Sequence, residues 1–182
     1  MPTSPSPSTP PPTAADAATH DPAFRGAASV LGVERPSSHR VVAVDPGVNG
    51  GIAWLEADGP RAIRMPETDG DILETFRGLR RRGAQRIAME LPAKCIFGAG
   101  HSSLATLHRN VGFLQGVAMA EGFELHLFQP QKWQTKLSLK KRPNEEQRHW
   151  KNRLKEEAQR RFPSLRVTLN NADALLILAS QQ

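Results

Sequence analysis

One stretch of fourteen residues decides the fold: Val41-Val42-Ala43-Val44-Asp45-Pro46-Gly47-Val48-Asn49-Gly50-Gly51-Ile52-Ala53-Trp54. Apolar residues run into Asp45, and a Pro-Gly and an Asn-Gly-Gly turn signal separate them from a second apolar run. This pattern predicts a buried strand that ends in a carboxylate and folds back as a hairpin. A buried carboxylate is unfavourable unless a positive group faces it, so Asp45 is a candidate functional residue. A local role, in which Asp45 only caps the turn, is also consistent with this stretch.

Length and composition predict one domain of ordinary size behind a tail. The chain has 182 residues, of which 38% are hydrophobic and 23% charged. Residues 1–39 are rich in Pro, Ser, Thr and Ala, which predicts a disordered or polyproline-like tail, and residues 40–182 are predicted to form the domain. A transit peptide is a weaker interpretation of the tail, because basic residues are nearly absent before Arg25 and acids are present.

The cysteine count and the hydropathy pattern indicate an intracellular protein. Cys95 is the only cysteine, so no disulfide forms within the chain. We find neither an apolar run of the length that spans a membrane nor a secretory signal pattern. We therefore expect a cytoplasmic protein of bacterial or phage type without a membrane partner, and an organellar location is a weaker alternative. A net charge of +6 and an isoelectric point near 10.1 favour a polyanionic partner.

Downstream of the hairpin, the periodicity predicts an α/β domain with a mixed sheet. Strand patterns alternate with helical patterns along the chain. The predicted elements are a short strand over 62–65, a helix over 69–82, a strand over 86–90, a long helix from 102 or 103 to 120, a strand over 125–128 and a helix over 170–179. Within the long helix, Gly112 and Gly116 predict a close approach to the sheet or to a second subunit.

Two further acids occupy settings like that of Asp45. Glu90 ends the predicted strand over 86–90, and Asp173 lies in the first turn of the nearly all-apolar final helix. An acid at a helix N-terminus is favourable for electrostatic reasons alone, which is the local explanation of Asp173. Because that helix must pack on the core, we expect Asp173 to lie close to Asp45 and Glu90. Three converging carboxylates can hold Mg²⁺ or Mn²⁺, and two such ions support phosphodiester hydrolysis.

The basic charge is concentrated in residues 129–166, which carry twelve Lys or Arg and four Glu. Such a segment favours contact with backbone phosphates, although a solvated helix face is the alternative. The aromatic rings of Trp133 and Trp150 lie among these bases. Phe97 is a further candidate for stacking on a base, with a core role as its alternative. The candidate DNA-binding residues are Lys132, Trp133, Lys136, Lys140, Lys141, Arg142 and Phe97. The Arg triplet at 80–82 suits either a helix C-terminus or DNA.

The order of these motifs resembles the RuvC-like Holliday junction resolvases of the ribonuclease H-like superfamily, including the plant organellar branch. The resemblance rests on Asp45-Pro-Gly with its Gly-Gly hairpin, on Ile-Ala-Met-Glu90, and on Ala-Asp173-Ala-Leu-Leu-Ile. It covers about residues 41–179 and also includes the Pro130-x-x-Trp133 segment.

The resemblance implies a ribonuclease H-like five-stranded mixed sheet flanked by helices. It also implies a homodimeric crossover junction endodeoxyribonuclease that cuts four-way DNA junctions symmetrically in recombination and repair. Asp45, Glu90 and Asp173 map onto the family's metal ligands. The family's fourth ligand falls at Leu169 or Asn170, and Asn170 offers only a neutral amide oxygen. A catalytically weak or inactive nucleic-acid-binding protein of the same fold is therefore the alternative, whereas the chain is too short for an actin-like ATPase.

Overall fold

The computed structural model describes residues 40–91 and 101–182, and for residues 101–104 it describes only the backbone. The predicted tail and Phe97 lie outside the described residues. The described residues form five strands: β1 (Val41–Asp45), β2 (Gly51–Glu56), β3 (Gly59–Arg64), β4 (Arg86–Glu90) and β5 (Glu124–Phe128). Five helices accompany them: α1 (Asp69–Arg81), α2 (His101–Ala120), α3 (Pro130–Lys136), α4 (Gln147–Arg161) and α5 (Ala172–Ser180). No helix in this described part has the length and apolar character needed to cross a membrane.

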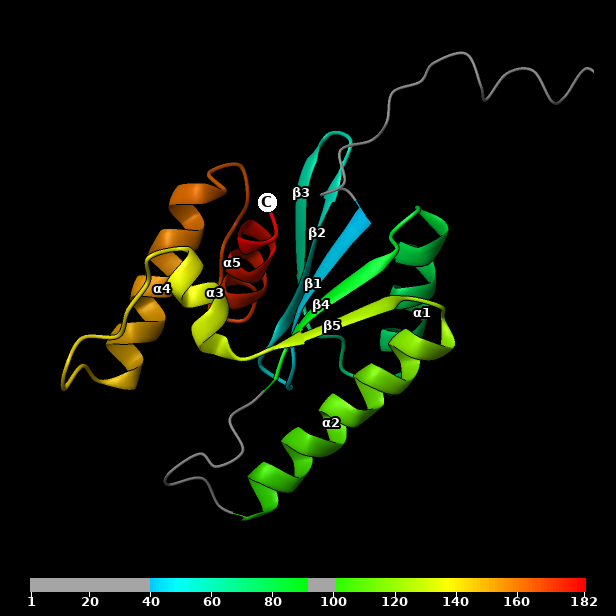
Figure 1. The fold of residues 1–182 in the computed structure, drawn as a ribbon, viewed down its shortest axis with the longest axis horizontal. Coiled ribbons are helices and arrows are strands. Elements are labelled where there is room, and N and C mark those ends of the chain that lie inside the picture. The colour runs from blue at the N-terminus through cyan, green and yellow to red at the C-terminus, as the bar shows by residue number, and fades with distance from the viewer. Residues whose placement is uncertain (1–39, 92–100) are drawn as a thin grey trace, which may run out of the picture. The chain divides into compact units, whose positions relative to one another are not determined.

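The strands form one mixed sheet in the order β3-β2-β1-β4-β5 (Figure 1). β1 pairs antiparallel with β2, and β2 pairs antiparallel with β3, as the predicted hairpin requires. β4 is parallel to β1, and β5 is parallel to β4. The predicted α/β fold with a mixed five-stranded sheet is confirmed. Because β1 and β4 are parallel neighbours, their carboxyl ends meet at one edge of the sheet.

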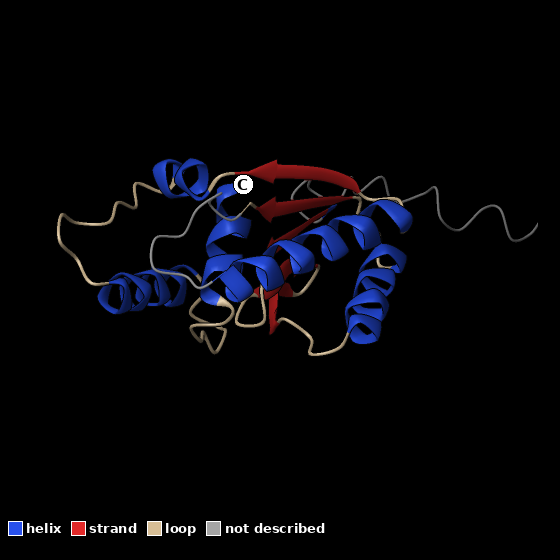
Figure 2. Cartoon of the chain, turned by 90° about the horizontal axis from the view of Figure 1, so that it is seen from below, coloured by secondary structure: helices blue, strands red, loops and turns tan. Residues whose placement is uncertain are grey.

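Successive residues of β1 point to opposite faces of the sheet, and each face has its own core. Val42 and Val44 pack with α1 and α2, whereas Val41 and Ala43 pack with α3, α4 and α5. Figures 1 and 2 show these two groups of helices on the two sides of the sheet. Burial on both faces explains why β1 is an uninterrupted apolar run instead of an alternating one.

A row of alanines crosses the sheet beneath α5. Ala43 pairs with Ala53 on β2 and with Ala88 on β4, and Ala53 pairs in turn with Ala62 on β3. These small side chains belong to the core that packs against α5, whose residues 172–178 are all buried. The row gives the apolar helix a shallow surface on which it can lie close to the sheet, and this contact fixes where the helix begins.

Gly51 lets the chain that precedes α5 approach the hairpin. A Cβ atom at Gly51 would lie 2.6 Å from the carbonyl oxygen of Asn170 and 2.8 Å from that of Ile63. Both neighbours are backbone atoms, so neither can move aside as the tip of a side chain does. The glycine therefore permits the contact that brings the N-terminus of α5 to the end of β1.

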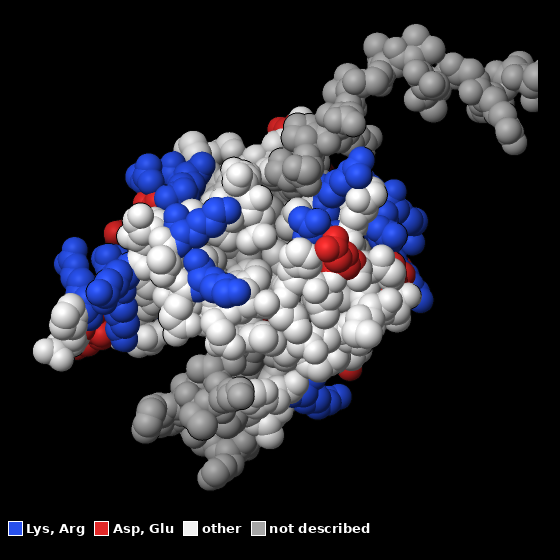
Figure 3. Space-filling view, in the orientation of Figure 1, with Lys and Arg blue, Asp and Glu red and all other residues white. Residues whose placement is uncertain are grey.

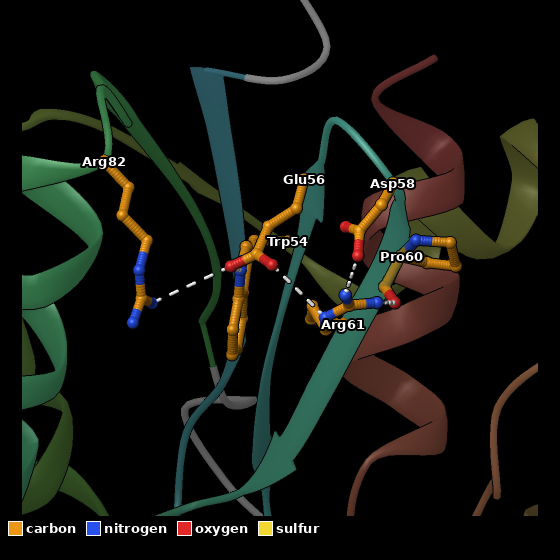
Figure 4. A network of polar contacts seen from close by, with 6 residues as sticks. All are labelled: Trp54, Glu56, Asp58, Pro60, Arg61 and Arg82. Atoms are coloured by element: carbon orange, nitrogen blue, oxygen red, sulfur yellow. Dashed lines mark hydrogen bonds and ion pairs between the residues drawn. The ribbon is translucent and has the colours of Figure 1, made fainter.

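At the other end of the β2–β3 hairpin, a polar network ties the hairpin to α1 (Figure 4). Glu56 accepts a hydrogen bond from the indole N–H of Trp54 at 3.0 Å and pairs with Arg61 at 3.2 Å. Arg61 also pairs with Asp58 at 2.5 Å, and Arg82, the residue after α1, lies 3.8 Å from Glu56. Arg82, from the Arg triplet, thus has a partner within the fold.

Two helices were absent from the predicted elements: α3, and α4, which was considered only as a solvated helix face. The sequence suggested that Pro130 only breaks the strand before it, whereas the structure begins α3 at that residue. A proline is well tolerated in the first turn of a helix, because its missing N–H would have no partner there and its fixed φ suits the helix. β3 also begins at Gly59, three residues before the predicted start, because it pairs with the whole of β2.

Candidate active site

Asp45 and Glu90 lie side by side at one edge of the sheet. The register pairs Val44 of β1 with Met89 of β4, and each carboxylate follows directly in its own strand. Asp173, in the first turn of α5, is buried with only 4% of its surface exposed. Since α5 packs over β1, β2 and β4, its first turn completes a group of three carboxylates.

The three carboxylates share one electrostatic environment. Burial, reinforced by the charges of Asp173 and Glu90, raises the pKa of Asp45 well above its usual range. Burial and the charge of Asp173 raise the pKa of Glu90 to about 7, although a hydrogen bond from Trp133 and the charge of Lys151 oppose this shift. Asp45 and Glu90 thus resist ionisation because water is scarce around them and their neighbours are negative. This is the arrangement that a bound cation would stabilise.

Trp133 supports Glu90 through a hydrogen bond. Its indole N–H donates to Glu90 Oε2 at 2.6 Å, and its side chain is only 2% exposed. The prediction that Trp133 offers its ring to DNA does not fit this burial, because no ring face is available for stacking. Trp150 is buried as well and packs in the same core. We assign Trp133 to the support of Glu90.

Lys151, which the sequence analysis did not single out, reaches into the site from α4. Its ammonium contacts Asp173 Oδ2. Burial lowers the pKa of Lys151, but the charges of Asp173, Asp45 and Glu90 outweigh this effect, so the pKa is raised. A signal was available: Lys151 lies three residues before Leu154 and seven before Ala158, both buried, and hence shares the packed face of the helix.

The donor atoms fit a hard divalent cation. Asp173 Oδ1 is buried and has no hydrogen-bond partner among the described residues, which is unfavourable for a carboxylate oxygen. Mg²⁺ and Mn²⁺ prefer such oxygen ligands. Within residues 40–91 and 101–182, no three His, Cys, Asp or Glu side chains are already grouped around a common metal position. The assignment of Asp45, Glu90 and Asp173 as metal ligands stays a prediction that the chemistry of these donors supports.

Asn171 holds the turn before α5. Asn171 occupies the N-cap position, but its side chain makes no capping hydrogen bond. Instead, Asn171 Oδ1 accepts from the backbone N–H of Thr168 at 2.8 Å and so holds the preceding loop. Asn170 is half-buried, and Leu169 is 49% exposed. Neither position supplies a carboxylate to the site.

The basic segment divides into two parts. On α4, Arg153 pairs with Glu145, and Arg160 and Arg161 pair with Glu157, as expected for a solvated helix face. Six exposed bases precede these residues and have no carboxylate partner within the described part of the chain: Lys132, Lys136, Lys140, Lys141, Arg142 and Arg148. Figure 3 shows lysine and arginine side chains gathered over the side of the molecule that carries α3 and α4.

Known structures with the same fold include two of RuvC. The structure is similar to that of Thermus thermophilus RuvC in complex with a Holliday junction substrate, with a TM-score of 0.53 and 15% identity over 77% of this chain and 90% of RuvC. A second RuvC structure from the same organism matches with a TM-score of 0.50. The chain has the ribonuclease H-like fold. No family model matches the sequence, and no curated protein matches it. At 15% identity this chain and RuvC share the ribonuclease H-like architecture. The activity of this chain depends on the residues of its own site.

Proposed function

We propose that this protein is a metal-dependent endonuclease that cleaves four-way DNA junctions by symmetric phosphodiester hydrolysis in recombination and repair. One observation carries the proposal: Asp45, Glu90 and Asp173 meet at the carboxyl edge of a ribonuclease H-like sheet. The similarity to RuvC bound to a Holliday junction supports branched DNA as the substrate.

Asp45, Glu90 and Asp173 would hold Mg²⁺ or Mn²⁺ through their carboxylate oxygens. When bound, the metal activates a water molecule and stabilises the leaving oxygen of the phosphodiester. Trp133 orients Glu90 by its hydrogen bond at 2.6 Å. The unpartnered oxygen of Asp173 is directed into a buried setting, where a charge interaction is stronger than in water.

The bases before α4 that have no carboxylate partner among the described residues would position the DNA. Lys132 and Lys136 are exposed on α3, the same short helix that carries Trp133. A phosphate bound by these lysines would therefore be held by the element that supports Glu90. Lys140, Lys141 and Arg142 extend the positive charge into the following loop. Contacts of this kind supply affinity and orientation without reading bases.

A symmetric cut needs two sites, so the proposal includes a homodimer. The exposed side of α2 is the surface we propose for it. Gly112 and Gly116 are exposed there, and a Cβ atom at either would meet nothing within 4 Å, so they do not face the sheet. Met119, on the next turn, is 68% exposed. Small residues beside an apolar one allow two such helices to approach closely.

The test compares a synthetic four-way junction with a linear duplex of the same sequence, each with Mg²⁺ and with chelator. We expect cleavage of the junction alone and only with Mg²⁺. Asp45→Asn, Glu90→Gln and Asp173→Asn should each abolish cutting, while junction binding persists because the phosphate contacts lie elsewhere. Cleavage at the parental rate by Glu90→Gln would refute the assignment of the site.

Paired cutting is tested on a cruciform plasmid. Two coordinated incisions linearise the plasmid, whereas a single incision leaves a nicked circle. Mixing the parent with an excess of Asp173→Asn protein should shift the product from linear to nicked, because mixed dimers hold one active site. An unchanged ratio of linear to nicked product would exclude the dimer.

The alternative is a weakly active or inactive protein of the same fold that binds branched DNA. The uncharged residues at positions 169 and 170 favour this alternative, since neither supplies a fourth carboxylate. Junction binding without cleavage at any concentration of Mg²⁺ or Mn²⁺ would establish it.

A further inference from the structure

We infer that the Lys151 ammonium fills one of the two cation positions of this site, so that each protomer binds a single divalent cation. The inference rests on the proposed function and concerns how the carboxylates are neutralised. It changes the metal requirement of the site and assigns Lys151 a direct role in it.

The partners of the Asp173 oxygens carry the inference. Oδ2 contacts Lys151 Nζ, while Oδ1 is buried and has no partner among the described residues. The Asp173 carboxylate thus contacts one cation, the Lys151 ammonium, through Oδ2. Its Oδ1 is left to contact a metal ion. A metal ion that bound both oxygens of Asp173 would have to displace the Lys151 ammonium. Asp173 is only 4% exposed, so this displacement would occur inside the protein.

Lys151 approaches along a side of the site that stays in contact with water. Its side chain is 40% exposed, whereas that of Asp173 is 5% exposed. Trp150 and Leu154, its neighbours on the packed face of α4, are buried and fix the direction of approach. The ammonium is therefore held by a rigid helix at a defined place and needs little reorganisation to stay there.

The charges of the site also favour a single divalent cation. Three carboxylates and one ammonium leave two negative charges, which one divalent cation neutralises. A second divalent cation would add two positive charges beside an ammonium, and the uncharged Asn170 offers nothing to offset them. Like charges repel, and the 5% exposure of the Asp173 side chain limits the water that would screen them there.

The experiment counts bound Mn²⁺ on the full chain by the loss of the electron paramagnetic resonance signal of free Mn²⁺. It is carried out on the protein alone and on its complex with the nicked duplex product, after subtraction of the Mn²⁺ that the DNA alone takes up. We expect one Mn²⁺ per protomer for the parent. Lys151→Met, which keeps the aliphatic stem, should bind two. Lys151→Arg keeps the charge and should bind one.

Lys155→Met is the matched control, because it removes the same charge one turn further along α4. Its count should stay at one, and the thermal unfolding of all three variants is compared with that of the parent. Two Mn²⁺ in the parent, or one in Lys151→Met, would overturn the inference and leave the proposed nuclease intact. No specific Mn²⁺ uptake by the parent, together with no cleavage, would overturn both.

Discussion

At the scale of single residues, Asp45, Glu90 and Asp173 form a site in which burial and neighbouring negative charge raise the pKa values of Asp45 and Glu90. The pKa of Glu90 is raised to about 7 by burial and by Asp173, although the indole N–H of Trp133 acts in the opposite direction. Lys151 offsets part of the negative charge through Asp173. The stability of the metal-free protein should therefore depend on pH in a way that these residues determine.

We predict that the metal-free protein loses stability as the pH rises from about 4.5 to about 7. Glu90 has an ordinary pKa of 4.5 and a folded-state pKa of about 7, so the folded protein binds this proton more tightly across that window. Stability falls with pH wherever the folded state binds more protons. Urea denaturation in chelator at several pH values should show this decline, and Glu90→Gln should flatten it.

Trp133→Phe provides the comparison, because it keeps a smaller buried aromatic ring and removes the indole N–H that opposes the shift. Its decline in stability should continue to a higher pH than that of the parent. If the parent and Glu90→Gln give parallel curves, Glu90 does not titrate in this window and its environment is wrongly assigned.

The acids of this site were predictable, but Lys151 was not singled out. Asp45 and Glu90 each end an apolar run, and Asp173 heads an apolar helix, so local pattern alone marks all three. Lys151 lies within a segment so rich in bases that its charge alone does not mark it, and its one signal in the sequence is the helical spacing from Leu154 and Ala158. Only the packing of α4 against α5 distinguishes it from Lys155.

At the scale of secondary structure elements, α5 is positioned by the residues beneath it. The alanines of the central strands bring the helix close to the sheet, and Gly51 admits the turn before it. The strands were predictable because the apolar runs and the turn residues between them indicate the same boundaries. α3 was not, since a proline after a strand signals either the end of structure or the first turn of a helix.

Gly51→Ala should separate stability from activity at this contact. The added Cβ would lie 2.6 Å from the Asn170 carbonyl oxygen, so the segment before α5 must move and Asp173 with it. We expect a loss of about 1–3 kcal/mol in the free energy of unfolding, typical of an overpacked site. The cleavage rate should fall more than that of a variant destabilised equally elsewhere.

Gly78→Ala is the control, because a Cβ at this position of α1 would meet nothing within 4 Å. It should keep full cleavage and at least the parental stability, since alanine favours a helix more than glycine does. Equal cleavage rates for Gly51→Ala and Gly78→Ala would show that the position of α5 does not limit the reaction.

At the scale of the whole molecule, the charges are segregated. The bases without a carboxylate partner lie on α3, in the loop before α4 and, as Arg148, in the first turn of α4, whereas bases toward the end of α4 pair with glutamates. The excess of positive charge in residues 129–166 was evident from the sequence. Its division into unpaired and paired parts was not, because it depends on the exposure and ion pairs of each side chain.

Charge reversal in the unpaired part should weaken junction binding and flatten its dependence on salt. Each lost phosphate contact removes about 0.9 from the slope of log affinity against log salt on duplex DNA. Lys132→Glu, Lys136→Glu and Lys140→Glu are therefore expected to reduce the slope, as measured by fluorescence anisotropy over a salt series.

Arg160→Glu is the matched control, because Arg160 is exposed and already paired with Glu157 at 2.7 Å. Its salt slope should equal that of the parent. If the three lysine variants also keep the parental slope, the bases before α4 form a solvated surface and the DNA lies elsewhere.

The order of the carboxylates along the chain has a consequence for biosynthesis. A ribosome delivers Asp45 first and Glu90 next, whereas Asp173 belongs to α5, which follows all the other described elements. Until α5 has left the exit tunnel and settled on the alanine row, a nascent chain can expose its basic segment to nucleic acid but lacks its third carboxylate. The site that we propose would thus stay incomplete on the nascent chain until α5 folds onto the sheet.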